Sequence, residues 1–133
     1  MISLFFRAQN DALSSANTNI AGLSAYYLDS FSRIAYYSGA FTFRRYGRVV
    51  EVSYAGSAVA QAAQSDYVEL FTLTSVFKPI GATYIMMHAA NGNAANDVVL
   101  QILSTGVVNT YNFNKAVSAG AQYRVHAVYL AAN

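Results

Sequence analysis

From Phe41 to the end of the chain, short runs of alternating apolar and polar residues are separated by turn-forming residues. A period of two places successive side chains on opposite faces of an extended strand, so this pattern restricts the chain to β structure. The clearest unit spans residues 41–54 and turns at Tyr46 and Gly47, where glycine supplies the positive φ that a tight turn needs. Its apolar positions on the two sides of the turn are Phe41, Phe43, Val50, Val52 and Tyr54. The sequence predicts a β-hairpin here.

Further segments with the same alternation follow along the chain. They are residues 66–73, 83–88, 98–103, 107–112 and 123–130. Between them, Pro79 breaks the pattern, residues 89–96 read as a polar loop, and the Ala-rich stretch 56–64 is expected to be a loop or a short helix. About seven or eight short strands at this spacing predict an all-β domain over residues 25–133, an antiparallel β-sandwich or jelly roll.

The first residues have a different period. Six apolar residues and Gln9 follow one another there in alternating steps of four and three, at Ile2, Phe6, Gln9, Leu13, Ala16, Ile20 and Leu23. This is the a/d spacing of a coiled coil, which predicts a short helical neck over residues 1–24 that associates with copies of itself. Ser14, Ser15 and Asn17 are poor helix formers, so an irregular N-terminal arm is the alternative.

The composition narrows the class of protein. Charged residues make up 11 % of the 133 residues, against about a quarter in a typical soluble domain, which favours an oligomer that hides part of its surface. The net charge of +2 does not fit a protein that binds duplex nucleic acid. Without cysteine the chain has neither disulfides nor thiolate metal sites. No run approaches the roughly 20 apolar residues of a membrane span, so membrane insertion is not expected.

Residues capable of catalysis are sparse. Of the two histidines, His126 lies within the last predicted strand and His88 ends another beside the Asn-rich loop. Neither has the spacing of a metal site, and no Gly-x-Ser-x-Gly motif supports a nucleophilic serine. The carboxylates Glu51 and Glu69 occupy polar positions of predicted strands, where a solvated face explains them better than a glycosidase pair. We therefore expect a protein that is not an enzyme and needs no cofactor or metal.

Arginines interleave with aromatic residues at the tip of the first hairpin. Arg44, Arg45 and Arg48 lie beside Phe43 and Tyr46, an arrangement that can track the phosphates and stack the bases of a single strand. Charge at the edge of a sheet also keeps strands from pairing with other chains. With so little basic surface elsewhere, the second explanation is preferred and no nucleic-acid partner is expected.

The remaining chemistry favours recognition of a polar ligand. Saccharides are held where an aromatic ring packs on the apolar face of a sugar and fixed amides, carboxylates or histidines contact its hydroxyls. The chain has eleven tyrosines and an Asn-rich loop next to His88. The predicted ligand-binding residues are Tyr84, His88, Asn91, Asn93, Asn96, Asp97, Tyr111 and Asn112.

Four segments together resemble a known kind of viral domain. Residues 43–57, 70–79, 99–108 and 125–130 are similar to the strand, turn and closing-strand segments in C-terminal head domains of bacteriophage tail-fibre and baseplate receptor-binding proteins. The resemblance implies a homotrimer with a helical or fibrous neck and a β-sandwich or jelly-roll head. It also implies a place at the tip of a virion fibre or baseplate, where the head binds a saccharide of the host cell surface. It carries over no binding residue by motif.

We therefore expect a non-catalytic head domain that attaches a phage to a bacterial surface saccharide. Two alternatives come from other classes: a purely structural module of a virion or fibre, and a bacterial lectin or adhesin domain. A glycosidase would require an accessible pair of carboxylates at catalytic separation.

Overall fold

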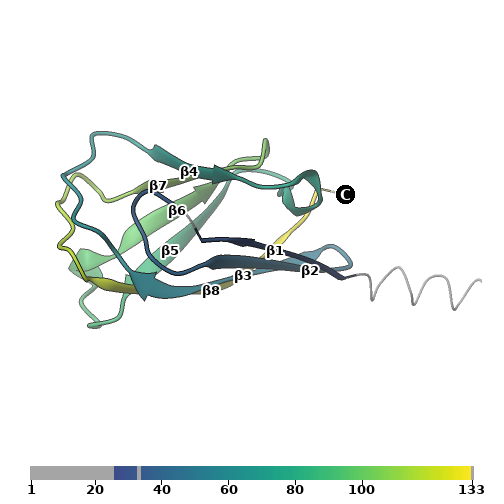
Figure 1. The fold of residues 1–133 in the computed structure, drawn as a ribbon. Helices are drawn as coiled ribbons and strands as arrows, with labels where there is room; N and C mark the ends of the chain where they lie inside the picture. The colour runs from purple at the N-terminus through teal and green to yellow at the C-terminus, as the bar shows by residue number, and fades with distance from the viewer. Residues whose placement is uncertain (1–25, 33, 133) are drawn as a thin grey trace, which may run out of the picture.

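The computed structural model describes residues 26–32 and 34–132, and the predicted neck over residues 1–24 lies outside them. The described chain folds into eight strands and two single-turn 3₁₀ helices (Figure 1). The strands are β1 (Tyr26–Phe31), β2 (Phe41–Tyr46), β3 (Val49–Ser57), β4 (Val68–Thr72), β5 (Thr83–Ala89), β6 (Val98–Ile102), β7 (Val107–Tyr111) and β8 (Gln122–Leu130). The 3₁₀ helices are η1 (Ser75–Phe77) and η2 (Ala94–Asn96).

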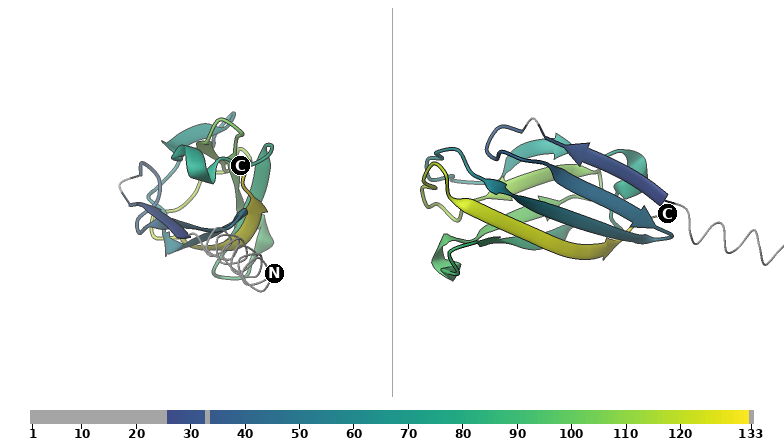
Figure 2. Two further views of the ribbon diagram at one scale, coloured as in Figure 1. Left: turned by 90° about the vertical axis from the view of Figure 1, so that its right-hand side faces the viewer. Right: turned by 60° about the horizontal axis from the view of Figure 1, so that its bottom comes forward.

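The strands form one nearly closed sheet in the order β1-β2-β3-β8-β5-β6-β7-β4, and every pairing is antiparallel. The sheet is narrowest where β5 meets β8, because only His88 and Ala89 pair across this junction. The outermost strands β1 and β4 approach each other through stacked rings of Phe31 and Phe71, with centroids 4.3 Å apart. Seen end-on, the strands surround a common interior (Figure 2). The prediction of an all-β, antiparallel domain is confirmed.

Both predicted hairpins are confirmed. In the first, β2 and β3 join at Gly47, whose φ is 56°, and Tyr46 pairs with Val49. In the second, β6 and β7 join through Gly106, whose φ is 93°. A Cβ atom at this position would lie only 3.1 Å from the carbonyl oxygen of Leu73. Glycine is required at both turns because other residues rarely adopt these φ values.

Of the stretch 56–64, expected as a loop or short helix, Gly56 and Ser57 belong to β3 and residues 58–64 form a loop. Strand β3 runs to Ser57, and isolated bridges then join Ala58 to Tyr37 and Gln61 to Val117. Gly56 permits this close approach, because a Cβ there would lie 2.2 Å from the carbonyl oxygen of Ser38. The backbone N–H groups of Ala58 and Gln61 donate to the carbonyl oxygens of Ala121 and Val117, and these bonds hold the loop against the β7–β8 connection.

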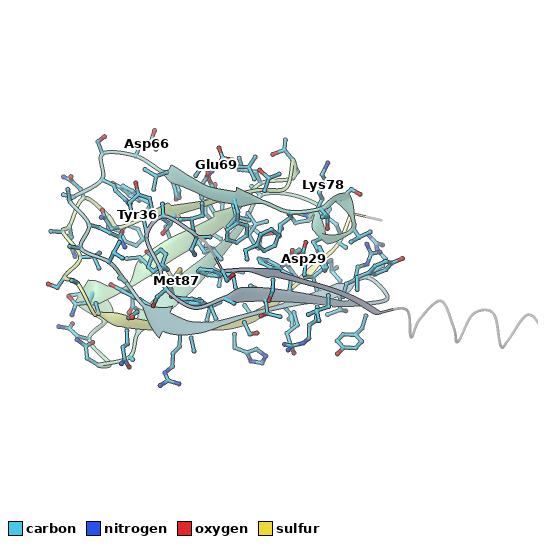
Figure 3. All side chains as sticks on the ribbon, viewed as in Figure 1. Asp29, Tyr36, Asp66, Glu69, Lys78 and Met87 are labelled. Carbon is cyan, nitrogen blue, oxygen red and sulfur yellow. The ribbon has the colours of Figure 1, made fainter. Side chains whose placement is uncertain are left out.

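The interior is aromatic beside β2 and β3 and aliphatic beside β5 and β6. Phe41 and Tyr54 stack with ring centroids 4.0 Å apart, and the buried ring of Tyr37 meets both of them edge-on. Leu100 and Met87 extend the core toward β5 and β6, and Figure 3 shows Met87 inside the molecule. Each large side chain buried in this way stabilises the fold by about 1.5–3 kcal/mol.

The start of β1 and the end of β8 lie at the same end of the molecule (Figure 1). The connection between β5 and β6, residues 90–97, lies at the opposite end with the connection between β7 and β8, residues 112–121. The 3₁₀ helices are the only helices among the described residues, and neither is long or apolar enough to cross a bilayer.

Candidate functional site

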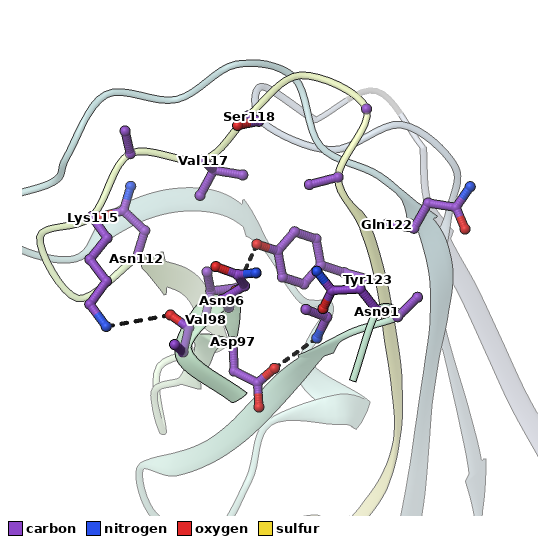
Figure 4. Close-up of a pocket in the computed structure, with 16 residues that line it drawn as sticks. Asn91, Asn96, Asp97, Val98, Asn112, Lys115, Val117, Ser118, Gln122 and Tyr123 are labelled. Carbon is purple, nitrogen blue, oxygen red and sulfur yellow. Dashed lines mark hydrogen bonds between the residues drawn. The ribbon is translucent and has the colours of Figure 1, made fainter. Parts of the chain in front are cut away.

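A pocket of about 570 Å³ lies between the β5–β6 and β7–β8 connections (Figure 4). Small residues such as Ala89, Ala90 and Ala121 shape its walls and leave the space open. The polar residues that line it are Asn91, Asn96, Asp97, Asn112, Lys115, Ser118, Gln122 and Tyr123. Four of the predicted binding residues, Asn91, Asn96, Asp97 and Asn112, are therefore brought together here.

Asp97 holds the β5–β6 connection in place. Its Oδ1 accepts a hydrogen bond of 2.8 Å from the backbone N–H of Ala89, and its Oδ2 lies 2.9 Å from Nδ1 of His88. Only 9 % of the Asp97 side chain is exposed, whereas 71 % of the His88 side chain is exposed. Both carboxylate oxygens are thus occupied, and His88 contributes to the pocket by positioning Asp97 without lining it.

Two contacts connect the walls of the pocket. The hydroxyl of Tyr123, on β8, donates a hydrogen bond of 2.8 Å to the carbonyl oxygen of Asn96. Nζ of Lys115 lies 3.4 Å from the carbonyl oxygen of Ala95 (Figure 4). Burial raises the pKa of the Tyr123 hydroxyl, so this donor keeps its proton at neutral pH. The side chains of Asn96, Ser118 and Gln122 have no partner among the described residues and remain available to a ligand.

Asn112 has a structural role in the pocket wall. Its side chain accepts a hydrogen bond from the backbone N–H of Gln64 and donates one to the carbonyl oxygen of Ala62, both 2.9 Å long. Its own backbone N–H donates to the side-chain oxygen of Gln64. With 2 % of its surface exposed, Asn112 fixes residues 62–64 against β7 and has no free amide group to offer.

Asn93 lies in the same connection but does not line the pocket. Its side-chain oxygen accepts from the backbone N–H of Ala95 and caps η2, while its own N–H donates to the side-chain oxygen of Asn91. These bonds fix the loop that carries Asn91 and Asn96 to the pocket.

Tyr84 and Tyr111 lie apart from the pocket, on the outer face of the half-sheet β5-β6-β7-β4. Strand register aligns Tyr84, Gln101 and Asn109 in one row across β5, β6 and β7. Gln101 donates a hydrogen bond of 3.2 Å to the Tyr84 hydroxyl, and Asn109 donates one of 2.8 Å to Gln101. Glu69 on β4 pairs with Asn109 and points outward at the end of the row (Figure 3).

Aromatic rings run beside this row. Tyr67, just before β4, has its ring centroid 5.2 Å from that of Tyr111 and 6.4 Å from that of Tyr84, and Phe113 lies 5.4 Å from Tyr111. Tyr84 is 58 % exposed. The pKa of Tyr67 is raised mainly by desolvation and to a smaller extent by the neighbouring hydroxyls of Tyr84 and Tyr111. We call this surface, formed by Tyr67, Tyr84, Gln101, Asn109, Tyr111 and Phe113, the tyrosine face.

Several residues of both surfaces are not predicted by the sequence. Gln101 and Asn109 lie beside Tyr84 because of the register between strands. The alternation of residues within one strand does not predict that register. Lys115 and Gln122 line the pocket because the β7–β8 connection folds over η2. A signal was present for Tyr67, because it lies within the predicted strand 66–73 in a tyrosine-rich sequence.

Within residues 26–32 and 34–132, no group of three or more histidine, aspartate or glutamate side chains could hold a metal ion. No family model and no curated protein matches the chain. The two surfaces themselves are therefore the basis for assigning a function.

Proposed function

We propose that this protein is a non-catalytic attachment domain that binds a saccharide on a bacterial cell surface. In this proposal it is the β-sandwich or jelly-roll head of a phage tail-fibre or baseplate receptor-binding protein, and residues 1–24 form a helical neck that assembles a homotrimer. The virion would present the head outside the cell.

The observation that carries the proposal is the tyrosine face. Its rings offer apolar surfaces on which the C–H face of a sugar can pack, and the adjoining amides offer donors and acceptors for hydroxyls. Hydrogen bonds from Asn109 to Gln101 and from Gln101 to Tyr84 fix the amides before any ligand arrives. A surface ordered in this way loses little side-chain entropy on binding.

The position of the pocket supports an attachment role. It lies at the end of the molecule opposite the start of β1 (Figure 1). A head held through its N-terminal side would therefore present Asn91, Asn96 and Gln122 away from the fibre.

A homotrimer is supported by an exposed apolar surface on the other half of the sheet. Register aligns Val49 with Leu130 and places Val128 beside Glu51, and Val128 is 63 % exposed. Leu28 on β1 lies across from Arg44 of β2 and is also exposed. We call the surface formed by Val49, Val128 and Leu130 the apolar face, from which Leu28 is separated by the Arg44–Glu51 ion pair. Apolar patches of this kind commonly mark protein interfaces.

The apolar face also favours the second candidate, a structural fibre module without a ligand. A bacterial lectin or adhesin domain would use the tyrosine face in the same way as a phage head. A test for binding to bacterial surface glycans distinguishes the structural module, which should not bind, from the phage head and the lectin or adhesin domain, which should.

The test is binding of the fluorescently labelled full chain to an array of bacterial cell-surface glycans, followed by titration calorimetry with the best ligand. We expect Tyr84→Ala and Tyr111→Ala each to weaken binding by roughly tenfold, or about 1.4 kcal/mol, because each removes a packing surface for the sugar. Tyr46→Ala is the control, since Tyr46 is a half-exposed ring on β2, outside the tyrosine face. Equal affinities for the wild type and both tyrosine-face variants would refute this surface as the binding site.

A further inference from the structure

A second, smaller hollow adjoins the pocket. It encloses about 260 Å³ and is lined by Ser38, the end of β3 at residues 55–57 and the start of β8 at residues 122–124. Gln122 and Tyr123 line both hollows, which therefore meet across the first residues of β8. Figure 4 shows the Gln122 side chain directed away from the Tyr123 ring and out of the larger pocket.

Each hollow contains one cationic side chain. Lys115 lines the larger and Arg124 the smaller, and both are exposed. The only carboxylate lining either hollow, Asp97, has both of its oxygens engaged by Ala89 and His88.

No carboxylate of the described residues lies within ion-pair distance of Arg124. His88 is its neighbour across the sheet, and His126 is two residues further along β8. The nearest acidic group on β3, Glu51, already faces Arg44 at 3.5 Å and His126 at 3.4 Å. The guanidinium of Arg124 is thus available to an anion from outside the protein.

We propose that the two hollows bind successive units of an acidic glycan chain, whose carboxylate or phosphate groups meet Lys115 and Arg124. This inference rests on the proposed saccharide-binding function and specifies the class of ligand. Arg124 offers a planar fork suited to two oxygens of one anion, and Lys115 offers a point charge. Between them, the free amide of Gln122 contacts hydroxyls of the chain.

The hydroxyls of Ser38 and Ser57 complete the smaller hollow. Their Oγ atoms lie 2.9 Å apart, and the Ser57 N–H donates to Oγ of Ser38. The Ser38 hydroxyl donates to the carbonyl oxygen of Ser57 at 3.0 Å, so the half-buried Ser57 hydroxyl is the one that can turn toward an anionic oxygen held by Arg124. A neutral sugar would leave Lys115 and Arg124 without an anionic partner, so we expect the hollows to prefer an acidic glycan.

The test compares three probes of equal length by calorimetry: an oligomer of a uronic acid, an oligomer of glycerol phosphate, and a neutral oligosaccharide. We expect one acidic probe to bind more tightly than the neutral one and to weaken when salt rises from about 50 to about 200 mM, because salt screens exposed charges. Tighter binding of the uronic acid identifies a carboxylate ligand, and tighter binding of glycerol phosphate identifies a phosphate ligand.

Lys115→Gln and Arg124→Gln should each reduce affinity for the acidic probe roughly two- to tenfold, with a larger loss in the double variant. Arg44→Gln removes the same charge outside both hollows and should leave this affinity unchanged.

Equal binding of acidic and neutral probes, or an unchanged double variant, overturns the inference. If neutral sugars then still bind through Tyr84 and Tyr111, the proposed function stands without it. Conversely, loss of binding in the cation variants but not in the tyrosine variants supports the acidic-glycan site and rejects the tyrosine face.

Discussion

At the residue scale, the polar side chains of the pocket divide into those that hold the protein together and those that remain free. The side chains of Asn112 and Asp97 form hydrogen bonds with the backbone of nearby segments. The side-chain amides of Asn96 and Gln122 have no such partner among the described residues. The sequence brought Asn96, Asp97 and Asn112 into one candidate set because all lie in or beside predicted loops. It does not separate their roles, because these depend on partners such as Gln64 that lie far away in the chain.

Asn112→Ala should destabilise the fold. It leaves the buried N–H of Gln64 and the part-buried carbonyl of Ala62 without their partner, and an unpaired buried group costs about 1–3 kcal/mol. We expect a fall of about 2–4 kcal/mol in the free energy of urea unfolding. Asn93→Ala, which removes an exposed cap from η2, should cost less than about 1 kcal/mol. Similar losses in the two variants would contradict this division of roles.

At the element scale, tyrosines of two strands anchor the connections between strands. Tyr54 of β3 donates its hydroxyl to the carbonyl oxygen of Ser38, and Tyr123 and Tyr129 of β8 donate theirs to Asn96 and Phe77. Alternation predicted the strands themselves, because one face of each is buried. It did not predict these anchors, since a tyrosine at a buried position can bond to any carbonyl that the fold brings near.

These anchors make stability sensitive to alkaline pH. Burial raises the pKa of Tyr54 to about 12, and desolvation also raises the pKa of Tyr129 and Tyr123. Because the unfolded chain loses these protons near pH 10, stability should be fully present below pH 10 and decline as pH rises toward 12. Each group contributes a slope of up to about 1.4 kcal/mol per pH unit, measured by urea unfolding between about pH 8 and pH 11.5.

Tyr54→Phe checks the assignment. It loses one hydrogen bond, so it should be less stable at pH 8, and its stability should decline less steeply above pH 10 because one titrating group is gone. An unchanged alkaline slope would exclude Tyr54 as a contributor.

At the scale of the whole molecule, the sequence predicted the class of fold but not its closure. The order of the strands places β8 between β3 and β5, so the last strand of the chain joins the meander β1-β2-β3 to the half β5-β6-β7-β4, in which β4 pairs with the distant β7. Pairings this distant in sequence have no local signature, and the narrow junction at His88 and Ala89 decides whether the strands form one sheet or two. The apolar face was equally hidden, because Val49 of β3 and Leu130 of β8 become neighbours only through the fold.

The solution mass tests the proposed homotrimer. Light scattering during gel filtration should give about three times the chain mass of 14.4 kDa, because an interface removes the apolar face from water. Val128→Arg should shift the mass toward that of a monomer, whereas Ala63→Arg, an exposed position outside this face, should not. A wild-type protein that runs as a monomer would refute the homotrimer and leave the apolar face without a partner.

The start of β1 and the end of β8 lie together at the end of the molecule remote from the pocket. A reporter domain genetically joined at either side would therefore stand well clear of Gln122 and Asn96. The chain is thus suited to conversion into a staining reagent: one fusion, applied to a panel of intact bacteria, would sort strains by the polymer they display. Such a survey would identify the surface that this domain binds from intact cells, without a chemical library chosen in advance.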